Sequence, residues 1–229
     1  MVTQLSLFLP AYNEEENLPT LIKDCDQFLK ANLKQYEIIV VDDGSSDNTR
    51  SLVGEIQKKY PHLSLVSHSG NQGYGQAIRT GIKAANYPWV FFMDSDNQFK
   101  IQDLNQFLTH PDFDLVIGYR IRRSDPIRRL LASKVYGLFV KTLFGLKVRD
   151  IDCAFKMMKK KSVEKLNFVS NSFFASTELL VLAKKSGLTI KEIGVHHHPR
   201  RAGNSTVTFS RVWHSLLELK ALYLRQVRA

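Results

Sequence analysis

The sequence contains little cysteine and no long apolar run, and each absence excludes a class of protein. The two cysteines, Cys25 and Cys153, lie far apart and outside any CxxC pair, which argues against a disulfide framework and a structural zinc site. No basic region precedes the first strand-like run, so we expect no secretory signal. The most apolar stretch, residues 135–146, is too short to span a bilayer and contains Lys141. Together these absences predict a cytoplasmic protein whose contact with a membrane is peripheral.

The positive charge of the chain is concentrated in one segment. The 229 residues carry a net charge of +10, and residues 120–165 hold 14 Lys/Arg against 4 Asp/Glu, so the remainder sums to zero. A local basic segment attracts phosphate groups, either of nucleic acid or of an anionic membrane. A solvated positive face without a partner is the alternative. Because no recognised nucleic-acid-binding motif accompanies the charge, we favour the membrane and expect no nucleic-acid partner.

Short apolar runs recur every 25 to 30 residues or so, with helical patterns between them. Runs that are apolar on both faces, such as residues 38–41, suit a parallel sheet covered by helices on both sides. We expect helices to begin at Asn13 and at residues 46–48. The alternation predicts an α/β fold of the Rossmann-like type without internal repeats. Its strands are expected at residues 5–9, 36–41, 63–67, 89–93, 114–118, 153–158 and 188–195.

Polar loops follow the first and second of these strands. Residues 10–14 and 41–47 combine a proline, an aromatic ring and several carboxylates, which can stack on a base and accept hydrogen bonds from it or from ribose. Ligands of open α/β sheets bind at the carboxyl ends of the strands, where both loops lie. A plain turn formed by residues 42–44 is the alternative.

A pair of carboxylates follows the strand expected at residues 89–93. Asp94 and Asp96 can share a hard divalent cation, which would bridge and neutralise a diphosphate. Earlier in the chain than this strand, residues 71–77 are expected to form a glycine-rich turn that leads into a helix over residues 78–85. The turn is neither a Walker A loop nor a full GxGxxG, so we predict close approach of a nucleotide to the backbone rather than a P-loop, with a simple turn as the alternative.

Taken in order, seven segments resemble the family 2 glycosyltransferases, and among them the polyprenyl- or dolichyl-phosphate mannosyl- and glucosyltransferases. The segments are PAYNEEENL, VVDDGSSDNT, NQGYGQAIRTGIKAA, MDSDNQ, VIGYR, DIDCAFKMM and HHPRRAGNST. The resemblance spans residues 5 to 206. It implies a GT-A fold, a nucleoside-diphosphate sugar donor such as GDP-mannose or UDP-glucose, inversion at the anomeric carbon, and Mg²⁺ or Mn²⁺ as cofactor.

The resemblance also implies roles for individual residues. The nucleoside would be contacted by Pro10, Tyr12, Glu14 and Asp43, with Gln72, Gly73 and Ala77 nearby. The diphosphate would lie near Ser95, with Asp94, Asp96 and Gln98 as metal ligands. Catalytic roles fall to Asp150, Asp152, Arg120 and Arg200, and Arg200 and Ser205 would close over the diphosphate with help from His197. A three-histidine zinc site at residues 196–198 is disfavoured, because consecutive strand residues face opposite sides.

We predict the acceptor from two features: which acceptor group can attack the sugar without a general base, and the basic segment at residues 120–165. A lipid phosphate is ionised at neutral pH and needs no general base, whereas a hydroxyl of a soluble or polysaccharide acceptor would need Asp152 or a neighbour as base. Residues 122–148 suit amphipathic helices in a membrane interface, with an ordinary core helix as the alternative. We therefore expect a catalytic domain at residues 1–209 and a helical tail at 210–229, peripherally bound at the inner face of a membrane.

Overall fold

A mixed, mainly parallel sheet forms the centre of the computed structural model, which describes residues 1–121, 127–199 and 218–225, with backbone alone for 127–134. The strand order is β3-β2-β1-β4-β6-β5-β7. Strand β6 runs antiparallel to both of its neighbours, and the other pairs are parallel. The predicted α/β sheet is confirmed. Its strands are β1 (Gln4–Ala11), β2 (Gln35–Asp42), β3 (Leu63–Ser67), β4 (Trp89–Phe92), β5 (Leu115–Arg120), β6 (Lys156–Lys159) and β7 (Ile190–Val195).

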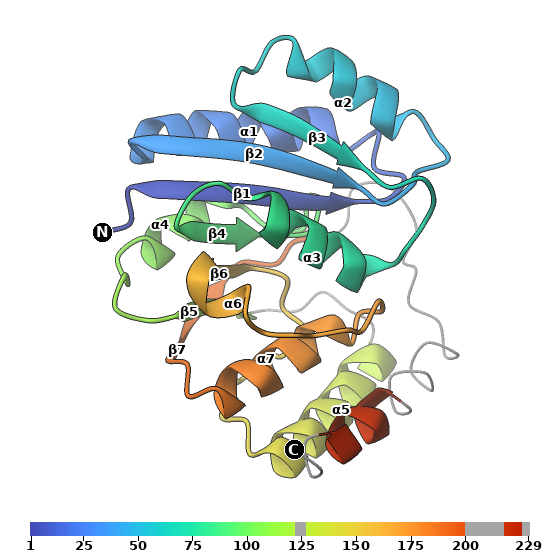
Figure 1. Ribbon diagram of the computed structural model, residues 1–229, viewed down its shortest axis with the longest axis vertical. Coiled ribbons are helices and arrows are strands. Elements are labelled where there is room, and N and C mark those ends of the chain that lie inside the picture. The colour runs from blue at the N-terminus through green and yellow to red at the C-terminus, as the bar shows by residue number, and fades with distance from the viewer. Residues whose placement is uncertain (122–126, 200–217, 226–229) are drawn as a thin grey trace.

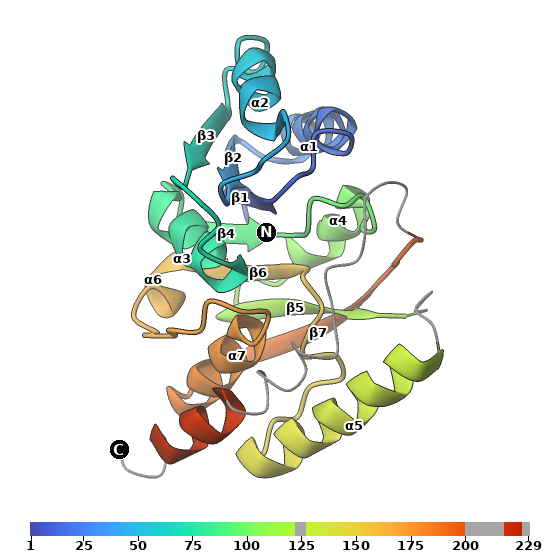
Figure 2. The ribbon, with the colours of Figure 1, turned by 90° about the vertical axis from the view of Figure 1, so that its right-hand side faces the viewer.

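Helices cover both faces of the sheet. In Figure 2, α1 and α4 lie on one face, and α3, α6 and α7 lie on the other. Helix α5 lies at the end of the molecule opposite β3 in both ribbon views (Figures 1 and 2). The helices are α1 (Leu18–Asn32), α2 (Thr49–Gln57), α3 (Tyr74–Ala84), a short 3₁₀ turn (Ile101–Asp103) leading into α4 (Leu104–Phe107), α5 (Ile127–Phe144), α6 (Lys160–Val163), α7 (Ala175–Lys185) and a helix at 218–225.

The central strands are buried on both faces, as their continuous apolar runs predict. Residues 38–41 of β2 are at most 1% exposed, and Phe8 of β1 stacks on Phe92 of β4 with ring centroids 5.2 Å apart. Each such side chain contributes roughly 1.5–3 kcal/mol when it leaves water. This two-sided burial fixes the sheet, and with it the positions of the loops at the ends of the strands.

The first helix begins later than predicted. Asn13 does not cap it, because this residue adopts a left-handed backbone with φ of 57° and its side-chain oxygen accepts a hydrogen bond from the Ser46 N–H at 2.8 Å. The chain therefore continues along the sheet edge, and α1 starts at Leu18 with Pro19 in its first turn. The second predicted start is confirmed within a residue, since α2 begins at Thr49, whose N–H donates to Asp47.

The region predicted to hold interface helices contains one described helix, α5 (Ile127–Phe144), while residues 122–126 lie outside the described part of the chain. No helix among the described residues is long and apolar enough to cross a membrane. Of the predicted tail at residues 210–229, residues 218–225 are helical, and the others lie outside the described residues. This helix is tied to α7 through an ion pair of 3.1 Å between Arg225 and the buried Glu178.

Two helical glycines differ in the space around them, so we expect their replacement by alanine to change the free energy of unfolding in opposite directions. A Cβ at Gly81 of α3 would lie 2.3 Å from the Phe8 ring, whereas a Cβ at Gly54 of α2 would meet nothing within 4 Å. We expect Gly81→Ala to lower the free energy of unfolding by about 1–3 kcal/mol through overpacking. The control, Gly54→Ala, should raise it by about 0.5–1 kcal/mol through helix propensity. Urea unfolding measures both, and equal effects of the two substitutions would contradict this packing.

Candidate active site

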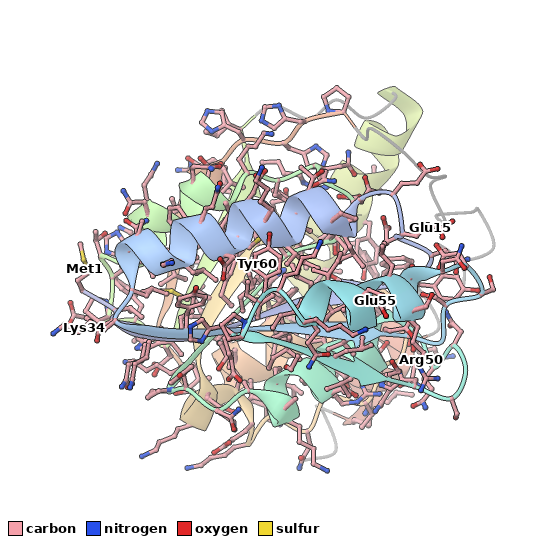
Figure 3. All side chains as sticks on the ribbon, turned by 90° about the horizontal axis from the view of Figure 1, so that it is seen from above. Met1, Glu15, Lys34, Arg50, Glu55 and Tyr60 are labelled. Carbon is pink, nitrogen blue, oxygen red and sulfur yellow. The ribbon has the colours of Figure 1, made fainter. Side chains whose placement is uncertain are left out.

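The loops predicted to bind ligand meet at the carboxyl ends of β1, β2 and β4. In Figure 3, Glu15 and Arg50, which follow the ends of β1 and β2, lie at one end of the molecule, and Met1 and Lys34 lie at the other. The buried Ser95 donates its hydroxyl proton to the Pro10 carbonyl at 2.7 Å, which joins the loop after β4 to the end of β1. The sheet thus brings together the three loops that the sequence singled out.

The loop after β1 carries the predicted residues Tyr12 and Glu14. The ring of Tyr12 is 41% exposed and is available for stacking on a base. Glu14 donates its backbone N–H to the Thr49 hydroxyl at 2.9 Å, and its carboxylate accepts a hydrogen bond from the Asn17 amide at 2.6 Å. The backbone of this loop is therefore held against the start of α2, while the aromatic ring remains accessible.

The Asp43 carboxylate organises the glycine-rich turn. Its two oxygens accept hydrogen bonds from the backbone N–H groups of Gln72 at 2.9 Å and Gly73 at 2.8 Å. One oxygen also lies 2.7 Å from Nδ1 of His68, whose Nε2 lies 2.9 Å from the Thr80 hydroxyl of α3. The sequence predicted Asp43 as a nucleoside contact. In the structure its carboxylate also holds the backbone of the glycine-rich turn. His68 was missed, although its position directly after β3 and before the turn is a usable signal.

The turn itself needs glycine at residue 73. Its φ is 96°, and a Cβ there would lie 2.2 Å from the Asn171 carbonyl oxygen. Helix α3 begins at Tyr74, four residues earlier than predicted, because the glycine reverses the chain immediately before it. Of the other residues predicted near the nucleoside, Gln72 exposes its side chain, whereas Ala77 is buried in the first turn of α3.

Asp94 and Asp96 lie at the end of β4, in a largely buried setting. Asp94 accepts a hydrogen bond from the Tyr74 hydroxyl at 2.9 Å, and Asp96, which is 4% exposed, accepts one from the Gln98 N–H at 3.1 Å. Burial and the neighbouring Asp96 raise the pKa of Asp94 from 3.8 to about 7, against the opposing effects of Tyr74, Lys156 and Arg120. Two carboxylates that repel each other in a largely buried place favour a proton or a cation between them. Tyr74 was not predicted as part of the site.

The predicted metal ligands fit a cation that also binds phosphate. Among the described residues, no group of three or more His, Cys, Asp or Glu side chains gathers to hold a metal ion. Mg²⁺ and similar ions are commonly held by one or two carboxylates together with substrate phosphates and water, and Asp94 and Asp96 suit that arrangement. The third predicted ligand, Gln98, donates its side-chain amide to the His198 carbonyl at 3.0 Å.

Arg120 and Asp150, predicted as separate catalytic residues, form a pair. The guanidinium donates two hydrogen bonds to the carboxylate, at 2.7 and 2.8 Å, and both side chains are at most 10% exposed. Burial by itself would lower the pKa of Arg120, but the hydrogen bonds and charge of Asp150 outweigh it and raise the pKa. Asp152, two residues on, is exposed and lies on the same turn. Arg120 and Asp150 are thus bound to each other, and Asp152 is the more exposed of the two predicted carboxylates on this turn.

The histidine run continues β7 towards the carboxylate loop. His196 contacts Asp103 through its backbone N–H at 2.7 Å and through its ring Nδ1 at 3.1 Å, and the ring of His197 lies against that of Phe99 with centroids 5.2 Å apart. The His198 N–H donates to the Gln98 carbonyl at 2.8 Å. The side chains of His196 and His197 thus face different partners, as the alternation of a strand predicts. Arg200 and Ser205 lie outside the described residues.

The raised pKa of Asp94 predicts how stability varies with pH. Between about pH 4 and 7 the folded protein holds a proton at Asp94 that the unfolded chain has released, so the free energy of unfolding should fall as the pH rises through this window. Asp94→Asn should remove this decrease and make the metal-free protein up to about 4 kcal/mol more stable than the wild type at pH 8.

Urea unfolding in EDTA at pH 5 and pH 8 measures this difference. The control is Asp112→Asn, which changes an exposed aspartate and should retain the wild-type dependence on pH. If Asp94→Asn and the wild type lose the same stability between the two pH values, Asp94 does not titrate as described.

Comparison with known proteins agrees with this geometry. The sequence profile described as Glycosyl transferase family 2 matches residues 6–167. A dolichyl-phosphate beta-glucosyltransferase of Trichomonas vaginalis is 30% identical over 210 residues, covering 83% of this chain and 64% of the relative. An undecaprenyl-phosphate 4-deoxy-4-formamido-L-arabinose transferase of Yersinia pestis is 28% identical over 222 residues, covering 95% and 67%. The chain thus spans about two thirds of the length of these relatives.

Solved structures show the same fold. Glucosyl-3-phosphoglycerate synthase from Mycobacterium tuberculosis, in complex with Mn²⁺, UDP-glucose and phosphoglyceric acid, superposes with a TM-score of 0.75 at 18% identity, over 96% of this chain and 80% of that one. Mannosyl-3-phosphoglycerate synthase from Rubrobacter xylanophilus gives 0.75 at 19% identity, over 98% and 74%. With the profile covering most of the sheet and the loops at its carboxyl edge, the chain belongs to glycosyl transferase family 2 and is a glycosyltransferase with the GT-A fold.

Proposed function

We propose that the chain transfers a hexose from a nucleoside-diphosphate sugar to a polyprenyl or dolichyl phosphate, with inversion at the anomeric carbon. The observation that carries the proposal is the carboxylate pair formed by the buried Asp96 and the partly buried Asp94, next to a glycine turn held by Asp43. A divalent cation bound to the pair would neutralise the diphosphate of the donor. The sugar-nucleotide and Mn²⁺ in the glucosyl-3-phosphoglycerate synthase complex support this choice of donor class.

The chain's own residues would bind and orient the donor. The exposed ring of Tyr12 would stack on the base, and the backbone of the turn at Gln72 and Gly73 would pass close to the nucleotide. An acceptor phosphate oxygen would attack the anomeric carbon from the side opposite the diphosphate, and the bond to the diphosphate would break as the nucleoside diphosphate leaves with the electron pair, which gives inversion. Because that oxygen is already ionised, Asp152 would orient the acceptor rather than remove a proton from it.

The lipid phosphate is favoured as acceptor by two independent features. Both sequence relatives named above act on lipid phosphates, as their names state. In addition, α5 presents exposed apolar side chains on one face, with Val135 70%, Leu138 67% and Phe139 54% exposed, while Val140 on the other face is fully buried. These residues follow a segment rich in arginine, and this combination suits a helix lying on an anionic membrane. We place this contact at the cytoplasmic face of the membrane.

A soluble acceptor is the second candidate. The two structural neighbours are named as synthases of phosphoglycerate glycosides, which are soluble products. In that case Asp152, exposed on the turn beside Arg120, would serve as general base for a hydroxyl. The two candidates differ in whether labelled sugar enters an organic-extractable product.

A donor panel tests the proposed function and the carboxylate pair together. GDP- and UDP-sugars are incubated with Mn²⁺ and polyprenyl phosphate, and labelled glycolipid is measured after extraction. We expect transfer from one donor, and a decrease of at least about 100-fold for Asp96→Ala, because the diphosphate loses its counter-charge. The control Asp112→Ala removes an exposed aspartate and should leave transfer unchanged. Undiminished transfer by Asp96→Ala would overturn the metal assignment, and label confined to a water-soluble product would favour the second candidate.

A charge on the exposed face of α5 tests the membrane contact. Leu138→Glu should weaken binding to vesicles containing anionic lipid by at least about fivefold, because it places a carboxylate among lipid chains or head groups. Sedimentation with the vesicles measures the bound fraction. The matched control is Gln27→Glu on α1, an exposed site that adds the same charge far from α5. Equal binding by the two variants would argue against α5 as the membrane-facing surface.

A further inference from the structure

A lysine lies fully buried at the start of β6, directly after the turn that carries the acidic residues Asp150 and Asp152. Lys156 is 0% exposed and belongs to β6, where it is paired with Phe92 of β4 and Ile117 of β5. A buried ammonium group is costly unless hydrogen bonds and opposite charges compensate for it. Neither the expected catalytic residues nor the packing of the core requires a charge at this position.

The ammonium group of Lys156 is bound to the turn that carries the acidic residues. It donates hydrogen bonds to the carbonyl oxygen of Ile151 at 3.2 Å and to that of Cys153, and it lies 5.8 Å from the centroid of the Phe92 ring. These two carbonyl groups flank Asp152 in the sequence. Lys156 therefore fixes the backbone on both sides of the accessible carboxylate.

The charge of Lys156 also acts on the rest of the site. Burial lowers the pKa of Lys156 below its usual 10.5, while the charges of Asp150, Asp152 and Asp94 oppose that decrease and favour the ammonium form. In return, Lys156 is one of the charges that lower the pKa of Asp94. Since the group is shielded from water, its field is screened less than that of a surface lysine. The ammonium group is held by the two carbonyl groups of the turn, and from there its charge favours the ionised forms of Asp150, Asp152 and Asp94.

A site lined by carboxylates attracts a metal ion but repels the phosphate groups of donor and acceptor. Arg120 is largely committed to Asp150, with two hydrogen bonds between them. Lys156 is buried and binds the turn through two carbonyl groups, so it can add positive charge to the site without occupying the space of a ligand. This position suits a residue that adjusts the potential of the site rather than one that touches the substrate.

We propose that Lys156 is a positioning residue that acts as a buried counter-charge, holding the turn around Asp152 and lowering the repulsion between the acidic site and an anionic acceptor. The inference rests on the proposed function, because it assumes a cation at Asp94 and Asp96 and a phosphate acceptor. A lysine with a purely structural role can be distinguished by how its replacement changes the binding of the cation and of the anionic acceptor. Loss of structure would weaken the binding of cation and anion together, whereas loss of the counter-charge should change the two in opposite directions.

The test compares Lys156→Met and Lys156→Gln in the full chain. Methionine removes the charge and the hydrogen bonds, and glutamine keeps an amide donor without the charge. The affinity for Mn²⁺ without substrate is measured by calorimetry, KM for polyprenyl phosphate by glycolipid formation, and folding by Tm. We expect both variants to bind Mn²⁺ about 3- to 10-fold more tightly and to show a KM for polyprenyl phosphate at least about 5-fold higher. Tm should not decrease for methionine, since an apolar group of similar volume often replaces a buried charge without loss.

The control is Lys161→Met, which removes a charge from an exposed position just after β6 and should change both constants by less than about twofold. Weaker or unchanged Mn²⁺ binding in both Lys156 variants, or failure of both to fold, would overturn the inference. If the wild type binds Mn²⁺ but forms no glycolipid with any donor, the proposed acceptor fails, and the Mn²⁺ affinities still decide whether Lys156 acts as a counter-charge. If the wild type binds no Mn²⁺, the metal assignment and this inference fail together.

Discussion

Buried carboxylates gathered at one edge of the sheet are the constraint on which the rest of the site depends. Asp43, Asp96 and Asp150 are at most 10% exposed and Asp94 is partly buried, and a carboxylate in such a place needs hydrogen bonds or opposite charge. Asp96 accepts a hydrogen bond from the Gln98 N–H, and the other three have partners of different kinds. Asp43 holds two backbone N–H groups, Asp94 accepts from a tyrosine hydroxyl, and Asp150 pairs with Arg120. The polar groups of the site are thereby ordered before a ligand arrives, which reduces the reorganisation required on binding.

The antiparallel strand β6 connects the two halves of this edge. It lies between β4, which ends in the carboxylate pair, and β5, which ends in Arg120. The chain enters β6 from the turn that carries Asp150 and Asp152, so this turn comes to lie beside Asp94. A parallel strand in the same place would have entered from the opposite edge, and the acidic turn would lie far from the carboxylate pair. The single reversal in the sheet therefore assembles the site.

The glycine turn is supported from outside the sheet as well. Its residue Gly75 donates an N–H to the Asn171 carbonyl at 3.0 Å, and Arg79 of α3 donates to the Ser170 carbonyl at 2.7 Å. The same segment binds the helix at 218–225, because the hydroxyl of Ser170 donates to Glu218 at 2.6 Å. The segment around residues 169–172 thus links the C-terminal helix to the nucleotide side of the site, and packing rather than chain connectivity provides the link.

The sequence by itself determined the fold class and most residues of the carboxyl edge. Periodicity located all seven strands, and the rule that ligands bind at strand ends selected the loops around Tyr12, Asp43 and Asp94, because local patterns and parallel pairing require nothing from distant residues. The pairing of Arg120 with Asp150, the hydrogen bond from Tyr74 to Asp94, the role of His68 and the burial of Lys156 could not be predicted in this way. Each depends on the reversed direction of β6 or on a contact between segments more than 15 residues apart in the chain. Such contacts follow from how the strands are ordered in space, which is a property of the whole packed core, so only the tertiary structure decided them.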